Sequence, residues 1–78
     1  MDQQNISDTF LAATLVALGF KILQVNKENP QRCVFLFETS PILETSIQEY
    51  LLGKLQVNPS LLFQSYKYVL SLLHDHEK

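Results

Sequence analysis

The sequence predicts a small single α+β domain in which three helices accompany an antiparallel β-hairpin. Three observations lead to this prediction: a Leu- and Ala-rich stretch that ends at a glycine, two alternating apolar runs around a turn segment, and two helical stretches that each begin with a cap residue followed by proline. We predict one domain over residues 1–78, with its core at about 7–73 and flexible ends at 1–5 and 75–78.

The first predicted helix begins at Asp8 and ends before Gly19. Ser7 supplies an N-cap oxygen, the Asp8 carboxylate favours the first turn, and Gly19 provides the stop. Apolar side chains point in several directions around this helix. A helix that is apolar nearly all round is usually packed on more than one side, so we expect several neighbours for it.

Two predicted strands, residues 20–25 and 32–38, form an antiparallel hairpin around the turn segment 26–31. Alternation divides the first strand between two faces: Phe20 and Ile22 against Leu23 and Val25. It divides the second strand in the same way: Cys33, Phe35 and Phe37 against Val34 and Leu36. Both faces are therefore apolar, and we expect the chain's own helices to cover one of them, with a partner subunit as a candidate cover for the other.

The second predicted helix covers residues 41–52 and ends at Gly53. Ser40 provides the cap and Pro41 the favoured first helical residue. Its apolar stripe consists of Leu43, Ile47, Tyr50 and Leu51. Residues 54–57, which follow, form either a short third strand or an extended linker, and the pattern does not decide between them.

The third predicted helix runs from Pro59 to about His74, with Asn58 as its cap. Its apolar arc spans roughly 220°, about twice the stripe that docks on one core. This excess predicts a second interface. We assign an oligomer interface to apolar residues of this helix and of the second strand: Val34, Leu36, Leu61, Tyr68 and Leu72.

Composition favours self-association as well. The chain has 78 residues, of which 46% are apolar. A domain of this size buries roughly 63% of the surface that its unfolded chain exposes. Many large side chains would stay exposed in a monomer, so we predict a homo-oligomer such as a homodimer; the alternative is a monomer docked on another protein.

Charge and cysteine content indicate whether the protein binds nucleic acid and in which compartment it is found. The formal net charge is −2 and the cationic residues are scattered, which argues against a protein held mainly by nucleic-acid phosphates. Cys33 is the sole cysteine, as is typical of a reduced cytosolic protein. The polar start is unlike a signal peptide and the apolar run 10–20 is too short to span a bilayer, so we predict a cytoplasmic protein.

The sequence holds no recognisable constellation of catalytic residues, so we predict neither an enzyme nor a bound cofactor or metal. Gly19 and Gly53 stand where helices stop rather than in a phosphate-binding loop. His74 and His76 are two residues apart and do not share a helix face, which is unlike a metal site. Cys33 lies in an apolar strand, where a small core residue is more typical than a nucleophile.

Five residues are candidate contacts for a partner or ligand: Arg32, Lys67, Tyr66, Tyr68 and Lys21. The Arg32 guanidinium can fork onto a phosphate or carboxylate, although a strand-end charge that pairs with Glu28 or Glu38 is the simpler interpretation. Tyr66 and Tyr68 diverge on their helix, so we expect one in the core and the other at its rim. With the lysine between them they resemble a base-stacking pattern, but on a helix the three do not form one surface.

The order of motifs resembles a known family. The residues that carry the resemblance are Ser7-Asp8, Leu18-Gly19-Phe20, Asn29-Pro30, Arg32 through Glu38, Tyr50, Gly53, Val57-Asn58-Pro59 and Phe63 through Lys67. They resemble short bacterial, phage and mobile-element proteins classed only as a domain of unknown function, over about residues 7–73. The resemblance implies an α+β domain linked to mobile elements, carries no assigned activity, and adds weight to Arg32 and Lys67 as contact residues.

We therefore expect a non-catalytic interaction module, a homo-oligomer that docks on or sequesters a protein or small ligand. The alternative is a nucleic-acid-binding accessory or regulatory protein, in which dimerisation gathers basic residues into one stripe: Lys21, Lys27, Arg32 and Lys67. A third hypothesis is an oligomer that traps a small phosphate-bearing ligand between basic residues and tyrosines.

Overall fold

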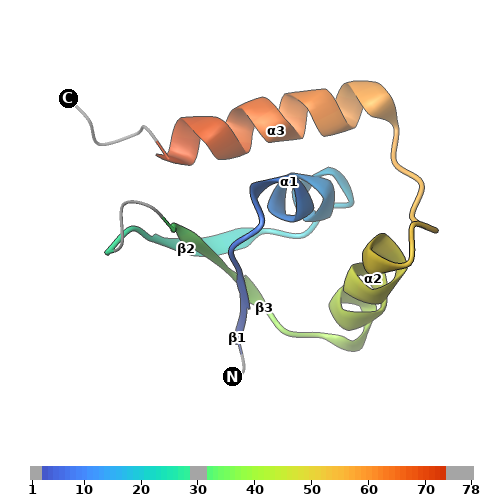
Figure 1. The fold of residues 1–78 in the computed structure, drawn as a ribbon, viewed down its shortest axis with the longest axis horizontal. Helices are drawn as coiled ribbons and strands as arrows, with labels where there is room; N and C mark the ends of the chain where they lie inside the picture. The colour runs from blue at the N-terminus through green and yellow to red at the C-terminus, as the bar shows by residue number, and fades with distance from the viewer. Residues whose placement is uncertain (1–2, 29–31, 74–78) are drawn as a thin grey trace.

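The computed structural model describes residues 3–28 and 32–73, and over these residues the chain is an α+β domain. The helices and strands follow one another in this order (Figure 1): β1 (Gln3–Ile6), α1 (Thr9–Ala17), β2 (Ile22–Asn26), β3 (Val34–Glu38), α2 (Pro41–Leu51) and α3 (Pro59–Leu73). The helix–hairpin–helix–helix order that the sequence predicts is confirmed. No helix among these residues has the length and apolar character needed to cross a bilayer.

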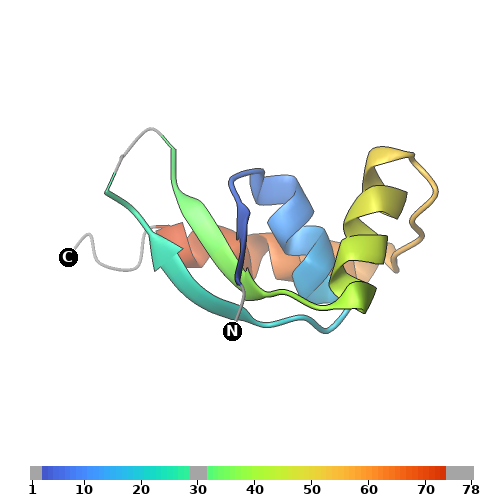
Figure 2. The same ribbon diagram turned by 90° about the horizontal axis from the view of Figure 1, so that it is seen from below.

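The three strands form one antiparallel sheet in the order β1-β3-β2, with β3 in the centre. Helix α1 lies between the sheet and α3, and α2 stands beside the sheet, at the end of β3 (Figure 1). Figure 2 views the strands from the side away from α3, and no described helix lies in front of them. The sheet therefore has one inner face, under α1, and one outer face.

Helix α1 is surrounded by other elements, as its apolar circumference predicts. Five consecutive residues of it are buried, from Leu11 to Leu15. The cap differs from the prediction by one residue: Asp8, and not Ser7, is the N-cap, and its Oδ1 accepts hydrogen bonds from the backbone N–H of Phe10 at 2.9 Å and of Leu11 at 3.2 Å. Gly19 follows the helix with φ of +104°, a backbone conformation that favours glycine.

The inner face of the sheet carries the aromatic part of the core. Phe35 and Phe37 are fully buried there, and Ile6 of β1 lies beside Phe35. On β2, Ile22 is paired with Phe37 and Val25 with Phe35, because the register shifts between Ile22 and Gln24. This irregularity corrects the predicted alternation, which assigned Ile22 and Val25 to opposite faces; both pack against the core.

The third strand is β1, at a place where the sequence predicts a flexible end. Of the residues 1–5 expected to be flexible, 3–5 belong to this strand, so that expectation is wrong for them. The polar composition of β1 concealed it, since Gln and Asn are poor strand formers and Ile6 is the strand's one apolar residue. Residues 54–57, the predicted site of a third strand, connect α2 to α3 outside the sheet.

Helices α2 and α3 begin at the predicted caps. The Ser40 hydroxyl accepts a hydrogen bond from the Leu43 N–H at 3.1 Å, and the Asn58 side chain accepts two from the first turn of α3. Leu43 is buried on α2, but Leu51 is 72% exposed and does not belong to the buried stripe, which corrects its predicted place. Helix α2 ends at Leu51, one residue early, and the predicted end of α3 at His74 lies outside the described residues.

Candidate functional site

The outer face of the sheet is the candidate functional site. Seven residues of the three strands define it, through alternation and the strand register: Gln3, Asn5, Gln24, Asn26, Val34, Leu36 and Glu38. Val34 and Leu36 of β3 form its apolar centre and are half-buried, whereas Phe35 and Phe37 on the inner face are fully buried. The predicted interface residues Val34 and Leu36 therefore lie together, in the middle of a face that no described helix covers (Figure 2).

Amide side chains surround this apolar centre. Leu36 has Asn5 on one side and Gln24 on the other, and Val34 has Asn26 beside it. A carboxamide both donates and accepts hydrogen bonds, so such a rim is compatible with a neutral partner surface. Apolar centres with polar rims are the usual composition of protein–protein interfaces.

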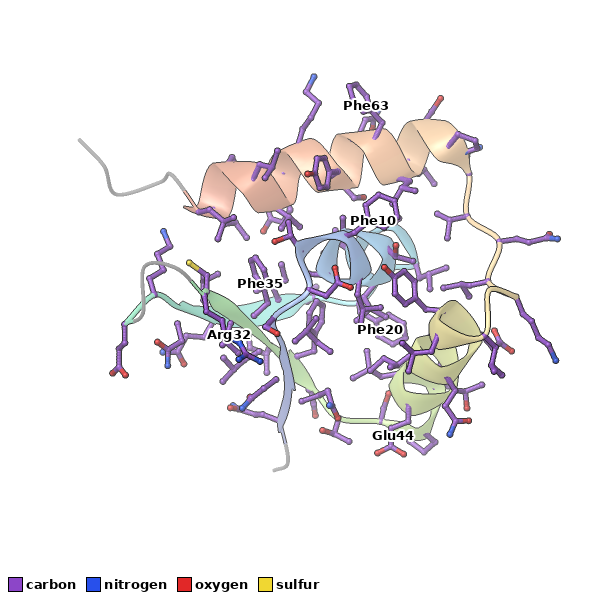
Figure 3. The ribbon with its side chains drawn as sticks, in the orientation of Figure 1. Phe10, Phe20, Arg32, Phe35, Glu44 and Phe63 are labelled. Carbon is purple, nitrogen blue, oxygen red and sulfur yellow. The ribbon has the colours of Figure 1, made fainter. Side chains whose placement is uncertain are left out.

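One basic and one acidic residue stand at opposite ends of the outer face. Arg32 lies two residues before Val34 and is exposed, on the opposite side of β3 from Phe35, which points toward α1 (Figure 3). Glu38 ends β3 and is exposed as well. Among the residues that the structure describes, neither Arg32 nor Glu38 forms an ion pair. The predicted pairing of Arg32 with Glu38 is not made within one chain, because six residues of extended strand span about 20 Å.

The second group of predicted interface residues lies on α3, away from the outer face. Leu61 and Tyr68 are each about half exposed, and Leu72, on the same flank, is half-buried. Tyr68 and the exposed Lys21 border one open hollow of about 290 Å³, which Val16, Phe20 and Ile22 complete. Lys21 also borders a wider hollow of about 460 Å³ at the end of the sheet. The structure thus brings Lys21 and Tyr68 together.

Tyr66 and Lys67 point to different sides of α3. Tyr66 packs against the core, with its ring edge-on to Phe10 at 6.0 Å between centroids, so the two tyrosines diverge as predicted. The Lys67 ammonium lies 5.1 Å from the ring centroid of Phe63, which points away from the sheet (Figure 3). Lys67 and Arg32 therefore lie on opposite sides of the molecule and do not form one basic surface.

A polar contact that the sequence did not predict joins α2 to the start of α1. The Tyr50 hydroxyl donates a hydrogen bond to Oδ2 of Asp8 at 3.4 Å. Burial and the neighbouring Asp8 carboxylate raise the pKa of Tyr50 above its ordinary value. Tyr50 also borders an apolar hollow of about 290 Å³ between α1, α2 and α3. Forty-two residues separate the two partners, and no local sequence pattern connects them.

Three residues considered for metal or nucleophile chemistry are Cys33, His74 and His76. Residues 3–28 and 32–73 hold no group of three or more His, Cys, Asp or Glu side chains able to bind a metal ion. Cys33 is half-buried just before β3. His74 and His76 lie outside the described residues.

Comparison with protein-family models gives a match over most of the chain. The family described as Domain of unknown function (DUF5659) matches residues 1–68. No curated protein and no solved structure matches the chain.

Proposed function

Because the chain belongs to the DUF5659 family, which carries no assigned activity, we propose its function from geometry: it is a non-catalytic interaction module that self-associates through the outer face of its sheet. The observation that carries this proposal is the apolar centre formed by Val34 and Leu36, on a face that none of the described helices covers. Antiparallel sheets do expose one face to water, but that face is then usually polar along its whole length.

A second copy of the same chain is the occupant that this face fits best. Its rim is built from amides: Gln3, Asn5, Gln24 and Asn26. Amides complement one another, since each donates and accepts, whereas a rim of one charge sign would repel its own copy. Arg32, just before β3, and Glu38, at the end of β3, are of opposite sign and stand at opposite ends of the face.

The size of the face predicts a weak dimer. Three strands about 4.8 Å apart, with five residues of about 3.3 Å each in β3, give a face of roughly 14 by 17 Å. Stable interfaces bury about 800 Å² on each partner, so this dimer belongs to the small, transient class. We expect a dissociation constant on the order of tens of micromolar or weaker, which suits a module that docks reversibly.

The cellular setting is part of the proposal. We place the module in the cytoplasm, where Cys33 stays reduced, and in a phage or mobile-element context.

A second candidate function rests on the hollow shared by Lys21 and Tyr68, which offers a cation beside an aromatic ring to a small phosphate-bearing ligand. Mass spectrometry of protein purified under native conditions tests it. Nucleic-acid binding has less support, since Arg32 and Lys67 lie on opposite sides.

Sedimentation equilibrium from about 10 µM to about 1 mM tests the dimer. We expect concentration-dependent association in the natural chain. Leu36→Gln removes burial worth on the order of 1 kcal/mol in each copy and twice that in the dimer, so its dissociation constant rises roughly 30-fold. Leu51→Gln is the matched control, because Leu51 is exposed on α2 and away from the strands.

Two results would overturn the proposal. One is a chain that stays monomeric throughout this concentration range. The other is a dimer that Leu51→Gln weakens and Leu36→Gln leaves unchanged, which would assign self-association to the helices. Circular dichroism of each variant checks that the fold is retained.

A further inference from the structure

We infer that the two copies pack about a two-fold axis perpendicular to their β3 strands, so that Arg32 of each copy faces Glu38 of the other. This inference rests on the proposed self-association through the outer face, and it goes further by fixing the orientation of the partner. It assigns Arg32 and Glu38, which form no ion pair among the described residues, to contacts between copies.

Two sheet faces that stack with their strands nearly aligned can be related by two-fold symmetry in two ways. The axis lies in the interface plane and runs either along the strands or across them. An axis along the strands sets each level of β3 opposite the same level of its copy. Arg32 then opposes Arg32 and Glu38 opposes Glu38, which places like charges together at both ends.

An axis across the strands reverses β3 relative to its copy. With the axis level with Phe35, Val34 faces Leu36 of the other copy and Arg32 faces Glu38 of the other copy. Each apolar residue then contacts an apolar residue of the other copy, and each charged residue contacts one of opposite charge. The symmetry makes each of these contacts occur twice. Charge complementarity therefore selects the antiparallel arrangement.

The same axis also places complementary amide side chains of β2 opposite one another. In this arrangement β2 lies over β2 of the copy, and Gln24, which is level with Leu36, faces Asn26, which is level with Val34. Asn26 already accepts a hydrogen bond from the Glu28 N–H at 2.9 Å through its Oδ1. Its amide NH₂ remains to donate to the Gln24 carbonyl of the other copy.

The spacing of packed sheets permits the charged contacts. Face-to-face sheets lie about 10 Å apart and cross at about 30°. An arginine and a glutamate extended toward each other span such a gap, and the arginine's length tolerates the displacement that the crossing angle causes at the ends of the strands. The central pair, Val34 and Leu36, lies close to the axis, where crossing displaces it least.

Charge reversal tests the orientation. In sedimentation equilibrium at low salt, Arg32→Glu and Glu38→Arg each raise the dimer dissociation constant about tenfold, and the double variant returns to within about threefold of the natural chain. Lys54→Glu is the control for net charge, because it changes the charge as much as Arg32→Glu does and lies exposed after α2, outside the sheet. Salt near 1 M, where the Debye length is about 3 Å, reduces these differences.

Arg32→Gln distinguishes the two axes. It weakens the antiparallel dimer by removing two attractive contacts, and it strengthens a dimer built about the other axis by removing a repulsion. A dimer that is sensitive to Leu36→Gln but strengthened by Arg32→Gln, or indifferent to both charge reversals, overturns this orientation and leaves the proposed function standing. A chain that is monomeric at about 1 mM overturns both.

Discussion

The two faces of β3 both carry apolar side chains but differ in how far these side chains are buried. Phe35 and Phe37 are fully buried beneath α1, whereas Val34 and Leu36, which alternate with them, lie on a face that no helix of residues 3–28 and 32–73 covers. All four residues are hydrophobic, so hydrophobicity alone does not explain why only Phe35 and Phe37 are fully buried. The difference is caused by α1, whose apolar circumference lets it contact the sheet on one side and α3 on another.

The comparison teaches that one central helix can supply most of a small core and still leave apolar surface elsewhere. Because α1 lies between the sheet and α3, both of these present their second side to solvent or to a partner. On α3, Val69 is buried while Leu61, Phe63 and Tyr68 are each about half exposed or more. The excess apolar surface is thus distributed over two outer layers.

Replacing one residue on each face of β3 gives the largest expected contrast. Phe35→Ala removes a fully buried ring and should lower the free energy of unfolding by about 3–5 kcal/mol. Leu36→Ala should cost less, about 1–2 kcal/mol in the monomer, because Leu36 is only partly buried. Urea unfolding at about 5 µM, below the dissociation constant expected for the dimer, measures both.

If both variants lost the same free energy of unfolding, the contrast between the faces would be wrong, since the outer face would then be covered as well as the inner one. Retained far-UV circular dichroism in Phe35→Ala with a lower urea midpoint supports loss of packing. Should that variant fail to fold, Phe35→Leu keeps most of the volume and still tests the inner face.

Local patterns predicted most of the fold. Cap-and-proline pairs at Ser40 and Asn58 fix where α2 and α3 begin, and the apolar circumference of α1 indicates its central place. Strand β1 escaped prediction because its stability comes from pairing with β3, more than 25 residues away, and not from its own polar residues. The irregular register of β2 was not predicted because it depends on how β2 pairs with β3, which alternation within β2 does not show.

The candidate site was predicted in part. Val34 and Leu36 were assigned to an interface from alternation alone, and they do share the outer face. Their separation from Leu61, Tyr68 and Leu72 depends on how α3 crosses α1, which residue spacing does not encode. Asn5 and Gln24 flank Leu36 through long-range strand pairing, so the amide rim could not be predicted from local sequence patterns.

The shifted register of β2 provides a second, smaller contrast. Val25 faces the core beside Phe35, whereas Leu23 is half exposed, although alternation assigns both to one face. Val25→Thr places a hydroxyl against the core and should cost on the order of 1 kcal/mol. Leu23→Thr should stay within about 0.5 kcal/mol of the natural chain. Urea midpoints of the pair measure the difference, and a larger loss for Leu23→Thr would restore regular alternation.

The smallest effect concerns the contact that holds α2 to α1, on the covered side of the molecule. Burial and Asp8 raise the pKa of Tyr50, so the folded chain holds the phenolic proton more tightly than the unfolded chain does. The resulting stability is fully present below the ordinary tyrosine pKa of about 10 and is lost as pH rises through the higher pKa of the folded state. We expect the free energy of unfolding to fall more steeply above pH 10 in the natural chain than in Tyr50→Phe.

Comparing these two chains removes the contribution of every other titrating group, which both chains share. Asp8→Asn separates charge from capping, since asparagine also caps a helix but carries no charge to oppose the phenolate. It should reduce the alkaline loss and keep α1 in place. Parallel stability curves for the natural chain and Tyr50→Phe between about pH 9 and pH 11.5 would show that α2 is held by its apolar contacts, Leu43 above all, and not by this hydrogen bond.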